Sequence, residues 1–550
     1  MKNIYIYLIL LINNSLFSQS ITVQADRYLH VFEGAGVSIG LYMGHHWSMN
    51  EANRDKAIRL INQDCNMLYL QDYVNIYPAD DPAYYDRRAD YIKAAKVYQP
   101  KMKISMVGNK FPSDLMRDTV IGGVAKTMLK TEDPMIYDKV ANWYFQLFKG
   151  FKDRGVEVDI LNVVNEPDFD KKYYYGQNGN TEKAVGLIFS QAVIKFKQML
   201  NNAAINTSNM KVPLIMGLST LDPNQCLYYM RYLKQNYPLG WAQIDIVSTH
   251  QYNNGTNETM LRTIGAEAEG KPFFQSEMHT NRGDNLGVLP IDEAHRGALS
   301  VAVLFGTAVR NGASAWFYFE NNYPNEYTPA GLIFVAWQSA NPVPYRHYYA
   351  FKQITSAQPA YSNVIERLVS NFPQGEITTF RKKGEDTIYV HASNFAGNLR
   401  TINLNVEGIN ATYKIKNYTI RTTDATRDDV ASPTVVFPEP VAQITPIINP
   451  YSVNTFKIVL KKEIGTSTIN NAENNSILIK QLGDLISVSS SNNQLIKSIF
   501  IYSITGQLME NKSEINAEIG EINTANYPSG IYLWDIKTDK IRVIKKILIE

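Results

Sequence analysis

Cysteine is scarce in this sequence, because Cys65 and Cys226 are the only two among 550 residues. Both lie in apolar contexts, which favours small buried side chains over a disulfide bond. The N-terminal apolar run at residues 4–12 is short, with nine residues, whereas roughly 20 are needed to span a bilayer. We therefore expect no disulfide and no stable membrane span.

The sequence also lacks an excess of charge of either sign. The chain has 54 lysines and arginines against 52 aspartates and glutamates, a formal net charge of +2. This balance argues against a nucleic-acid partner, which a basic surface would attract. With 45% apolar and 19% charged residues, the composition is that of a globular protein with several cores. The length predicts about three domains.

Metal-ligand spacings are missing as well. His45 and His46 are adjacent, so on a strand or a helix their side chains would point apart. No carboxylate–histidine spacing like that of a zinc helix accompanies them. We therefore expect neither a metal nor a cofactor.

Residues 1–20 have the pattern of an export signal peptide. Lys2 precedes the apolar run at 4–12, and small or polar residues follow through Ser18 and Ser20. No cysteine follows this region to accept a lipid. We expect the protein to be secreted or held at the cell surface.

Residues 21–360 alternate apolar runs with amphipathic stretches, which is typical of an α/β fold, a (β/α)8 TIM barrel. The helix before the fourth strand is the clearest, because Tyr144, Phe148 and Phe151 recur at helical spacing and Gly155 follows. The eight predicted strands are residues 35–40, 67–71, 103–107, 159–164, 213–217, 244–249, 272–276 and 313–318.

Two glutamates end strands of this predicted barrel. Asn165, Glu166 and Pro167 follow the fourth strand, and Glu277 follows the seventh. The 111 residues between them (277 − 166) leave room for three βα units of roughly 35 residues each. Side chains at these strand ends face the site where barrel enzymes bind substrate. Retaining glycoside hydrolysis needs such a pair, one as acid and base and one as nucleophile.

The rest of the chain has β alternation. Residues 361–462 predict an attached β-sandwich, which the strands within 21–32 are expected to join. A polar linker follows at 463–476, and residues 477–550 predict a small C-terminal all-β module. This module carries the segments 501–507 and 526–532 and the ending 541–550. It resembles the C-terminal sorting domain of type IX secretion in Bacteroidetes, which implies the type IX machinery as a partner.

The barrel and sandwich together resemble glycoside hydrolase family 30, within the clan A retaining glycosidases. The matching segments are 32–36, 163–167, 250–252 and 348–353, with Glu277 after the seventh strand and Trp316 in the eighth. The resemblance implies that Glu166 is the acid/base and Glu277 the nucleophile. Glu258, Glu267 and Glu320 are the competing candidates for the second role.

The departures from family 30 concern the substrate. An arginine common on the second strand of this clan has no match in residues 68–71, and the usual tryptophans after the third strand are replaced by residues 108–112. Family 86, the agarases and porphyranases, is therefore a second possible resemblance.

The expected substrate-binding residues lie at or after strand ends. We expect Asn165 to donate to the sugar 2-hydroxyl, His250 and Tyr252 to lie near Glu277, and Trp316 to form the sugar-stacking floor. His45, His46, Lys110 and Arg282 are candidates for a polar or basic subsite that favours charged sugars. Trp47 and Asn109 complete the predicted substrate-binding set.

The sequence thus predicts a secreted, monomeric retaining β-glycosidase. Its expected action is internal cleavage of an extracellular polysaccharide of the xylan, glucan or galactan type, or of a red-algal galactan. The alternative is a catalytically inactive carbohydrate-binding barrel, which would keep aromatic residues at the rim but would not need both Glu166 and Glu277.

Overall fold

A computed structural model describes residues 19–549 except 41–42, 75, 109–110, 122–123, 170–180, 254–255, 281–285, 287–288, 325–329, 339–340, 410, 464–476, 483, 491–493, 505 and 541. The predicted signal peptide lies outside the described residues apart from 19–20, as does the predicted linker apart from Glu463. The chain divides into two compact units, Met1–Lys462 and Glu463–Glu550.

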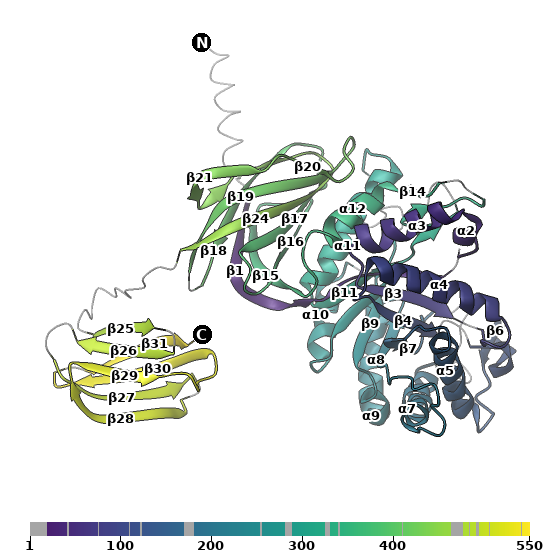
Figure 1. The fold of residues 1–550 in the computed structure, drawn as a ribbon, viewed down its shortest axis with the longest axis horizontal. Coiled ribbons are helices and arrows are strands. Elements are labelled where there is room, and N and C mark those ends of the chain that lie inside the picture. Colours follow the sequence, from purple (N-terminus) through teal and green to yellow (C-terminus); the bar gives the residue numbers. More distant parts are fainter. Residues whose placement is uncertain are drawn as a thin grey trace, which may run out of the picture. The chain divides into compact units, whose positions relative to one another are not determined.

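The first unit contains a closed barrel of eight parallel strands, as predicted (Figure 1). Every predicted barrel strand overlaps one of the observed strands. Around the barrel their order is β10, β11, β2, β3, β4, β7, β8, β9. Their bounds are β2 (Gly34–Ile39), β3 (Tyr69–Val74), β4 (Lys103–Gly108), β7 (Ile160–Asn162), β8 (Leu214–Thr220), β9 (Ile246–His250), β10 (Phe273–Glu277) and β11 (Ala313–Tyr318).

Helices cover the outside of the barrel, so the strands are buried on both faces and read as continuous apolar runs. The predicted stripe on α5 is buried, and Gly155 adopts a left-handed φ of 78° after the helix ends. The helices are α2 (Met43–Ser48), α3 (Glu51–Arg59), α4 (Pro82–Tyr98), α5 (Ile136–Lys152), α6 (Thr181–Leu187), α7 (Ile194–Asn201), α8 (Pro223–Asn236), α9 (Pro238–Trp241), α10 (Glu258–Glu267), α11 (Glu293–Arg310) and α12 (Arg346–Thr355).

The barrel interior is layered. Toward the amino ends of the strands it is filled by an apolar cluster that includes Tyr69, Met216 and Phe274. The next layer is polar, where Ser219 Oγ donates to Asn162 Oδ1 at 2.9 Å and lies 2.8 Å from Ser248 Oγ. Because the apolar layer closes one end, the carboxyl ends of the strands are left for a polar site.

Two insertions that the sequence did not predict lie in the connections after strands. β5 (Met116–Ile121) and β6 (Val124–Leu129) form a hairpin between β4 and α5. β12 (Asn322–Tyr323), β13 (Ile333–Phe334) and β14 (Val343–Pro344) form a small sheet between β11 and α12. Strands of two residues carry too little alternation to predict from sequence.

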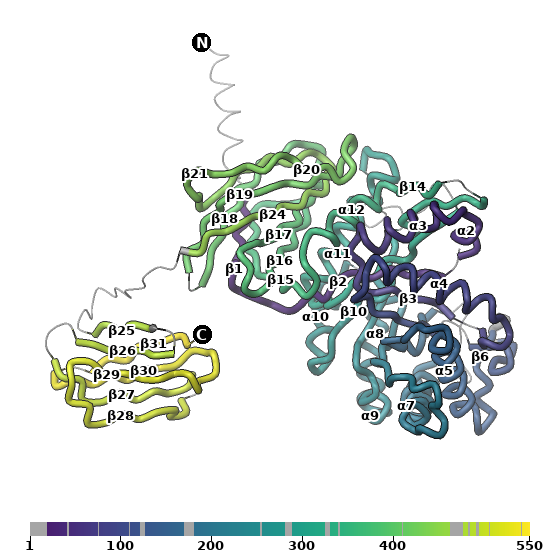
Figure 2. The backbone as a smooth tube through the Cα atoms, viewed as in Figure 1, coloured from purple at the N-terminus to yellow at the C-terminus, as the bar shows by residue number. Residues whose placement is uncertain are grey.

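The predicted sandwich region forms an eleven-stranded sheet around its own apolar core. β1 (Gln19–Phe32) belongs to it, pairing antiparallel with β15 and parallel with β18, although it is distant in sequence from both (Figure 2). The other strands are β15 (Ser362–Ser370), β16 (Gly375–Arg381), β17 (Thr387–Asn394), β18 (Arg400–Glu407), β19 (Thr412–Thr423), β20 (Val430–Ala431), β21 (Val435–Val441), β22 (Gln443–Ile444), β23 (Ile447–Ile448) and β24 (Ser452–Glu463).

The second unit is all-β, as predicted, with two antiparallel sheets over a core that contains Trp534. Its strands are β25 (Ile477–Leu482), β26 (Leu485–Ser490), β27 (Ile496–Ser503), β28 (Leu508–Ala517), β29 (Ile519–Asn523), β30 (Gly530–Thr538) and β31 (Arg542–Ile549).

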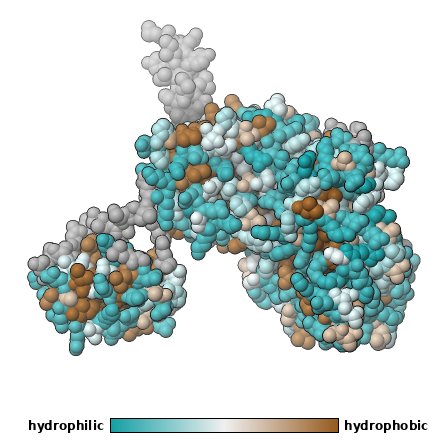
Figure 3. Space-filling model, in the orientation of Figure 1, coloured by the Kyte–Doolittle hydropathy of each residue, from teal (hydrophilic) through white to brown (hydrophobic). Residues whose placement is uncertain are grey.

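The surface in this view is mainly hydrophilic, with apolar side chains in small groups (Figure 3). Cys65 and Cys226 are buried, as their apolar contexts predict. Among the described residues, no helix is both long enough and apolar enough to cross a membrane.

Candidate active site

Glu166 and Glu277 meet at the carboxyl ends of the barrel strands. Glu277 is the last residue of β10, and Glu166 lies just beyond β7. A carboxylate oxygen of one lies within 4.8 Å of a carboxylate oxygen of the other. Both side chains are mostly buried, with 13% of Glu166 and 8% of Glu277 exposed.

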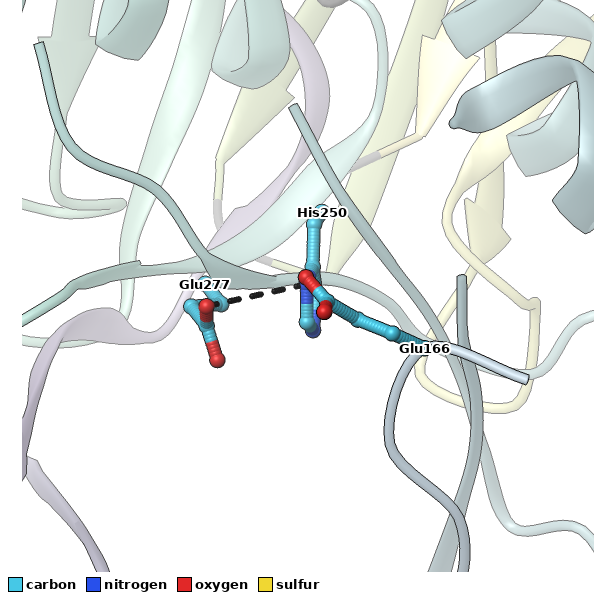
Figure 4. A group of neighbouring side chains, drawn as sticks. All are labelled: Glu166, His250 and Glu277. Carbon is cyan, nitrogen blue, oxygen red and sulfur yellow. Dashed lines mark hydrogen bonds and ion pairs between the residues drawn. The ribbon is translucent and has the colours of Figure 1, made fainter. Parts of the chain in front are cut away.

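His250 lies between the two carboxylates (Figure 4). It ends β9, and its side chain is fully buried. Its Nδ1 atom is 3.0 Å from Glu166 Oε1 and 3.9 Å from Glu277 Oε1. Burial lowers the pKa of His250 below its usual value, which favours the neutral ring. His250 therefore holds Glu166 by a hydrogen-bond contact and lies beside Glu277 without a hydrogen bond to it.

Two tyrosine hydroxyls hold the carboxylate of Glu277. Tyr252 Oη donates to Glu277 Oε1 at 2.8 Å, and Tyr73 Oη donates to Glu277 Oε2. The sequence pointed to Tyr252 but missed Tyr73. The predicted second strand ended at residue 71, whereas β3 continues to Val74. Tyr73 follows Gln71 by two residues, and this alternation was the signal that could have revealed it.

A buried amide positions both Tyr73 and Glu277. Gln71 Nε2 lies 3.1 Å from Tyr73 Oη and donates to the backbone oxygen of Ser276 at 2.9 Å. Here Gln71 and Tyr73 supply neutral donors on the strand where clan A enzymes commonly carry an arginine.

The two glutamates have different electrostatic surroundings. Burial raises the pKa of Glu166 to about 7. The charge of Glu277 does not contribute to this rise, which burial causes. Burial, together with the charge of Glu166, raises the pKa of Glu277 above its usual value, and the influence of His250 and the hydroxyls of Tyr73 and Tyr252 offsets only part of this rise.

Glu166 is held by an unusual backbone conformation. Its φ of 46° is left-handed, and its backbone N–H donates to the oxygen of Ser219 at 2.8 Å. Non-glycine residues in this region cost energy and cluster at functional sites. Asn165, immediately before it, is 5% exposed.

Two predicted binding residues are placed where they cannot act as expected. Trp316 is fully buried, and its ring packs on Phe305 and Phe351 of α11 and α12. Its neighbours in β11 face the barrel interior, so Trp316 points outward and is no sugar-stacking floor. His46 is also buried, and burial lowers its pKa to about 3. His46 is therefore neutral and supplies no basic subsite.

The other predicted binding residues divide into two groups. His45 and Trp47 lie on α2, on the same face of the barrel as the glutamates. Asn109, Lys110 and Arg282 lie outside the described residues.

The competing carboxylates have other contacts. Glu258 pairs with Arg310, and Glu267 pairs with Arg231. Glu320 is fully buried, and its charge offsets part of the lowering of the Arg88 pKa, to about 9, that burial causes. This leaves Glu166 and Glu277 as the pair that can act together.

The site also has the donor set of a cation site. One ligand atom each of Glu166, His250 and Glu277 lies within 4.8 Å of the others. A cation there would compete with the two hydroxyl hydrogen bonds to Glu277.

Removing the Tyr73 hydroxyl should change the pH dependence of any reaction that needs ionised Glu277. Hydroxyl donors favour the ionised carboxylate, so Tyr73→Phe should shift the acidic limb of kcat/KM to higher pH. The rate on the acidic side should fall about 10- to 100-fold, as expected for a hydrogen bond to a charged group. Tyr98→Phe removes a hydroxyl that contacts Asp55 instead and serves as the control. An unchanged acidic limb in Tyr73→Phe would contradict this role.

Comparison with known proteins assigns the second unit. Residues 482–550 match the family model described as a secretion system C-terminal sorting domain. This segment is a C-terminal sorting domain. The sorting domain implies handling by type IX secretion and delivery outside the cell or to its surface.

Solved structures resemble the first unit. A family 30 endoxylanase from Clostridium papyrosolvens C71 aligns with a TM-score of 0.61 at 15% identity, over 80% of this chain and all of that one. A conserved exported protein from Bacteroides fragilis aligns equally well at 11% identity, over 80% of this chain and 100% of that one. An endo-β1,6-glucanase aligns with a TM-score of 0.55 at 12% identity, over 81% of this chain and 94% of that one. At these identities the likeness shows the fold alone. No curated protein matches the sequence.

Proposed function

We propose that this protein is a secreted, monomeric glycoside hydrolase that retains anomeric configuration, with Glu166 as acid/base and Glu277 as nucleophile. The observation that carries the proposal is the meeting of these two buried glutamates at the carboxyl end of the barrel. The fold they share with a family 30 endoxylanase supports it, and so does the C-terminal sorting domain.

The distance between the carboxylates favours retention. Their nearest oxygens lie within 4.8 Å, whereas retaining enzymes hold the two groups about 5–5.5 Å apart and inverting enzymes about 6.5–9.5 Å apart. An inverting enzyme needs room for a water between carboxylate and sugar. The closer spacing supports direct attack by a glutamate.

The first step forms a bond between Glu277 and the sugar. The ionised carboxylate attacks the anomeric carbon, while the bond from that carbon to the leaving oxygen breaks. Protonated Glu166 gives its proton to the leaving oxygen. The second step reverses these roles: Glu166 takes a proton from water, the water oxygen bonds to the anomeric carbon, and Glu277 leaves as a carboxylate.

The surroundings of the pair support this assignment of roles. A pKa of about 7 keeps much of Glu166 protonated near neutral pH. Glu277 accepts two tyrosine hydroxyls, which favour its ionised form. In the proposed roles, the shared proton resides on Glu166 and the negative charge on Glu277. Asn165, which precedes the acid, is the proposed donor to the sugar 2-hydroxyl.

The proposed substrate is an extracellular polysaccharide cut internally. The similar structures include a xylanase and a β1,6-glucanase, and a red-algal galactan is a third candidate. Residues 1–20 would act as the export signal, and the C-terminal sorting domain would direct the later step of export, by type IX secretion.

The decisive experiment is incubation of the purified protein with a panel of plant and algal polysaccharides. Product sizes should reveal internal cleavage. Proton NMR should detect first the product anomer whose configuration is the same as that of the cleaved glycosidic bond. Addition of EDTA should leave the rate unchanged. An inverted first product would overturn retention, and loss of activity on chelation would favour a metal-dependent hydrolase at Glu166, His250 and Glu277.

The alternative is an inactive carbohydrate-binding barrel. It would bind polymers of the panel without releasing products, and Glu277→Gln would leave that binding unchanged. Such a protein has no need for a carboxylic acid with a raised pKa beside a hydrogen-bonded carboxylate.

Removing residues 470–550 should separate export from activity. The barrel and its sheet have their own cores, distinct from that of the second unit, so the purified truncated protein should keep nearly full activity. Export from the native cell should fail, which fractionation of cells and medium would measure. An insoluble or inactive truncated protein would mean that the second unit stabilises the first.

A further inference from the structure

A cavity of about 600 Å³ lies on the same face of the barrel as the two glutamates. Its lining includes Gly40 after β2, Trp47 on α2, Tyr84 and Arg87 near the start of α4, and Trp337 after β13. Helices of a barrel begin where strands end, so these residues share the face where substrate binds. The volume is in the range of ligand sites, about 300–1,000 Å³.

We propose that this cavity is a substrate subsite for a sugar residue with an anionic group, a carboxylate or a sulfate, and that Arg87 binds that group. This inference rests on the proposed glycosidase function and specifies the class of its substrate.

The cavity adjoins the nucleophile through one side chain. A Cβ atom on Gly40 would lie 3.4 Å from the ring of Tyr73, and the hydroxyl of Tyr73 donates to Glu277. Gly40 of the cavity lining therefore packs against the side chain that holds the nucleophile.

The aromatic side chains suit a sugar ring. Trp337, which follows β13, is 61% exposed. Trp47 is half-buried on the other wall. An exposed indole costs hydrophobic free energy in the absence of a ligand, and its face complements the C–H surface of a sugar.

Hydrogen bonds hold the two walls together before any ligand binds. The ring Nδ1 of His45 lies 3.1 Å from the backbone oxygen of Val335. The backbone N–H of Gln338 donates to Ser48 Oγ at 3.0 Å, and Gln338 has a left-handed φ of 54°. A preformed cavity loses less entropy on binding.

Arg87 gives the cavity its charge. Its side chain is exposed, and no acidic side chain of another described residue pairs with it. The described lining residues include no aspartate or glutamate. The neighbouring Arg88 is different, because it is buried, pairs with Asp72 and donates to the oxygen of Gly40 at 3.0 Å. A guanidinium matches the planar oxygens of a carboxylate or sulfate.

Binding to matched polymers tests this subsite in a Glu277→Gln background, which prevents turnover. Affinity electrophoresis would compare glucuronoxylan with its carboxyl-reduced form, and porphyran with its desulfated form. Arg87→Ala should weaken binding of a charged polymer at least fivefold without affecting its neutral form, and should remove the salt dependence of binding. Trp337→Ala should weaken binding of both forms. Lys93→Ala, an exposed lysine on the same helix that pairs with Asp90, is the matched control.

The outcomes separate this inference from the proposed function. Equal binding of charged and neutral forms, unchanged binding of the charged form by Arg87→Ala, or no binding to any of the four polymers would overturn the subsite. Hydrolysis of a neutral polymer would then still support the glycosidase. Charge-selective binding through Arg87 without hydrolysis by the native protein would instead support the subsite and overturn the glycosidase. Preference for the sulfated over the carboxylated polymer would identify which anionic group it takes.

Discussion

Glu277→Gln should lower kcat by at least about three orders of magnitude while the fold is kept, because an amide cannot attack the anomeric carbon. This loss corresponds to about 4 kcal/mol of transition-state stabilisation. Glutamine has nearly the same shape and can still accept one of the hydroxyl hydrogen bonds from Tyr73 and Tyr252.

Steady-state kinetics on the best polymer of the panel would measure this loss, with circular dichroism as the check on folding. Glu132→Gln alters an exposed glutamate that pairs with Arg117 and is the control, which should keep full activity. A Glu277→Gln protein with more than a tenth of the native rate would show that another group is the nucleophile.

Glu166→Gln should lower the rate by about 10²- to 10⁴-fold, the usual contribution of a general acid and base. It should also change the shape of the pH profile. The reaction needs protonated Glu166, whose pKa is raised to about 7, so the alkaline limb of the native profile should fall as the pH rises through this value. Glutamine does not titrate, so the residual rate of the variant should lack this fall.

Rates of the native protein and of Glu166→Gln between pH 5 and 9 would test this assignment. A native rate that stays constant up to pH 9 would mean that the acid has a much higher pKa or is a different group. A fall near pH 7 in both proteins would assign the titration to a group other than Glu166.

Strand order and carboxylate position were predictable because they follow from local patterns. Apolar runs bounded by turns mark barrel strands, and Glu166 and Glu277 follow two of these runs. Any residue at the carboxyl end of a parallel strand reaches the same face of the barrel. Tyr252 was predictable for the same reason, since it follows the sixth strand closely.

Side-chain direction was not predictable, because one residue of register reverses it. The sequence places Trp316 in the eighth strand but does not say which way it points. In the folded barrel Ala315 and Phe317 face the interior, so Trp316 points toward α11 and α12. His46 is similarly a basic residue by sequence, but burial in the fold keeps it neutral.

The sequence by itself determined the order of the parts: eight βα units, a β-rich region, and a small β module with the marks of a sorting domain. It also predicted that Glu166 and Glu277 share one face of the barrel, because strand ends fix position along the barrel axis, whereas the structure set aside Glu258, Glu267 and Glu320 as partners of Glu166. Only the tertiary structure decided the hydroxyl of Tyr73 on Glu277, the contact of the His250 nitrogen with Glu166, and the cavity that joins Trp47, Arg87 and Trp337. These contacts unite segments far apart in the chain, and their geometry depends on packing that no local pattern records.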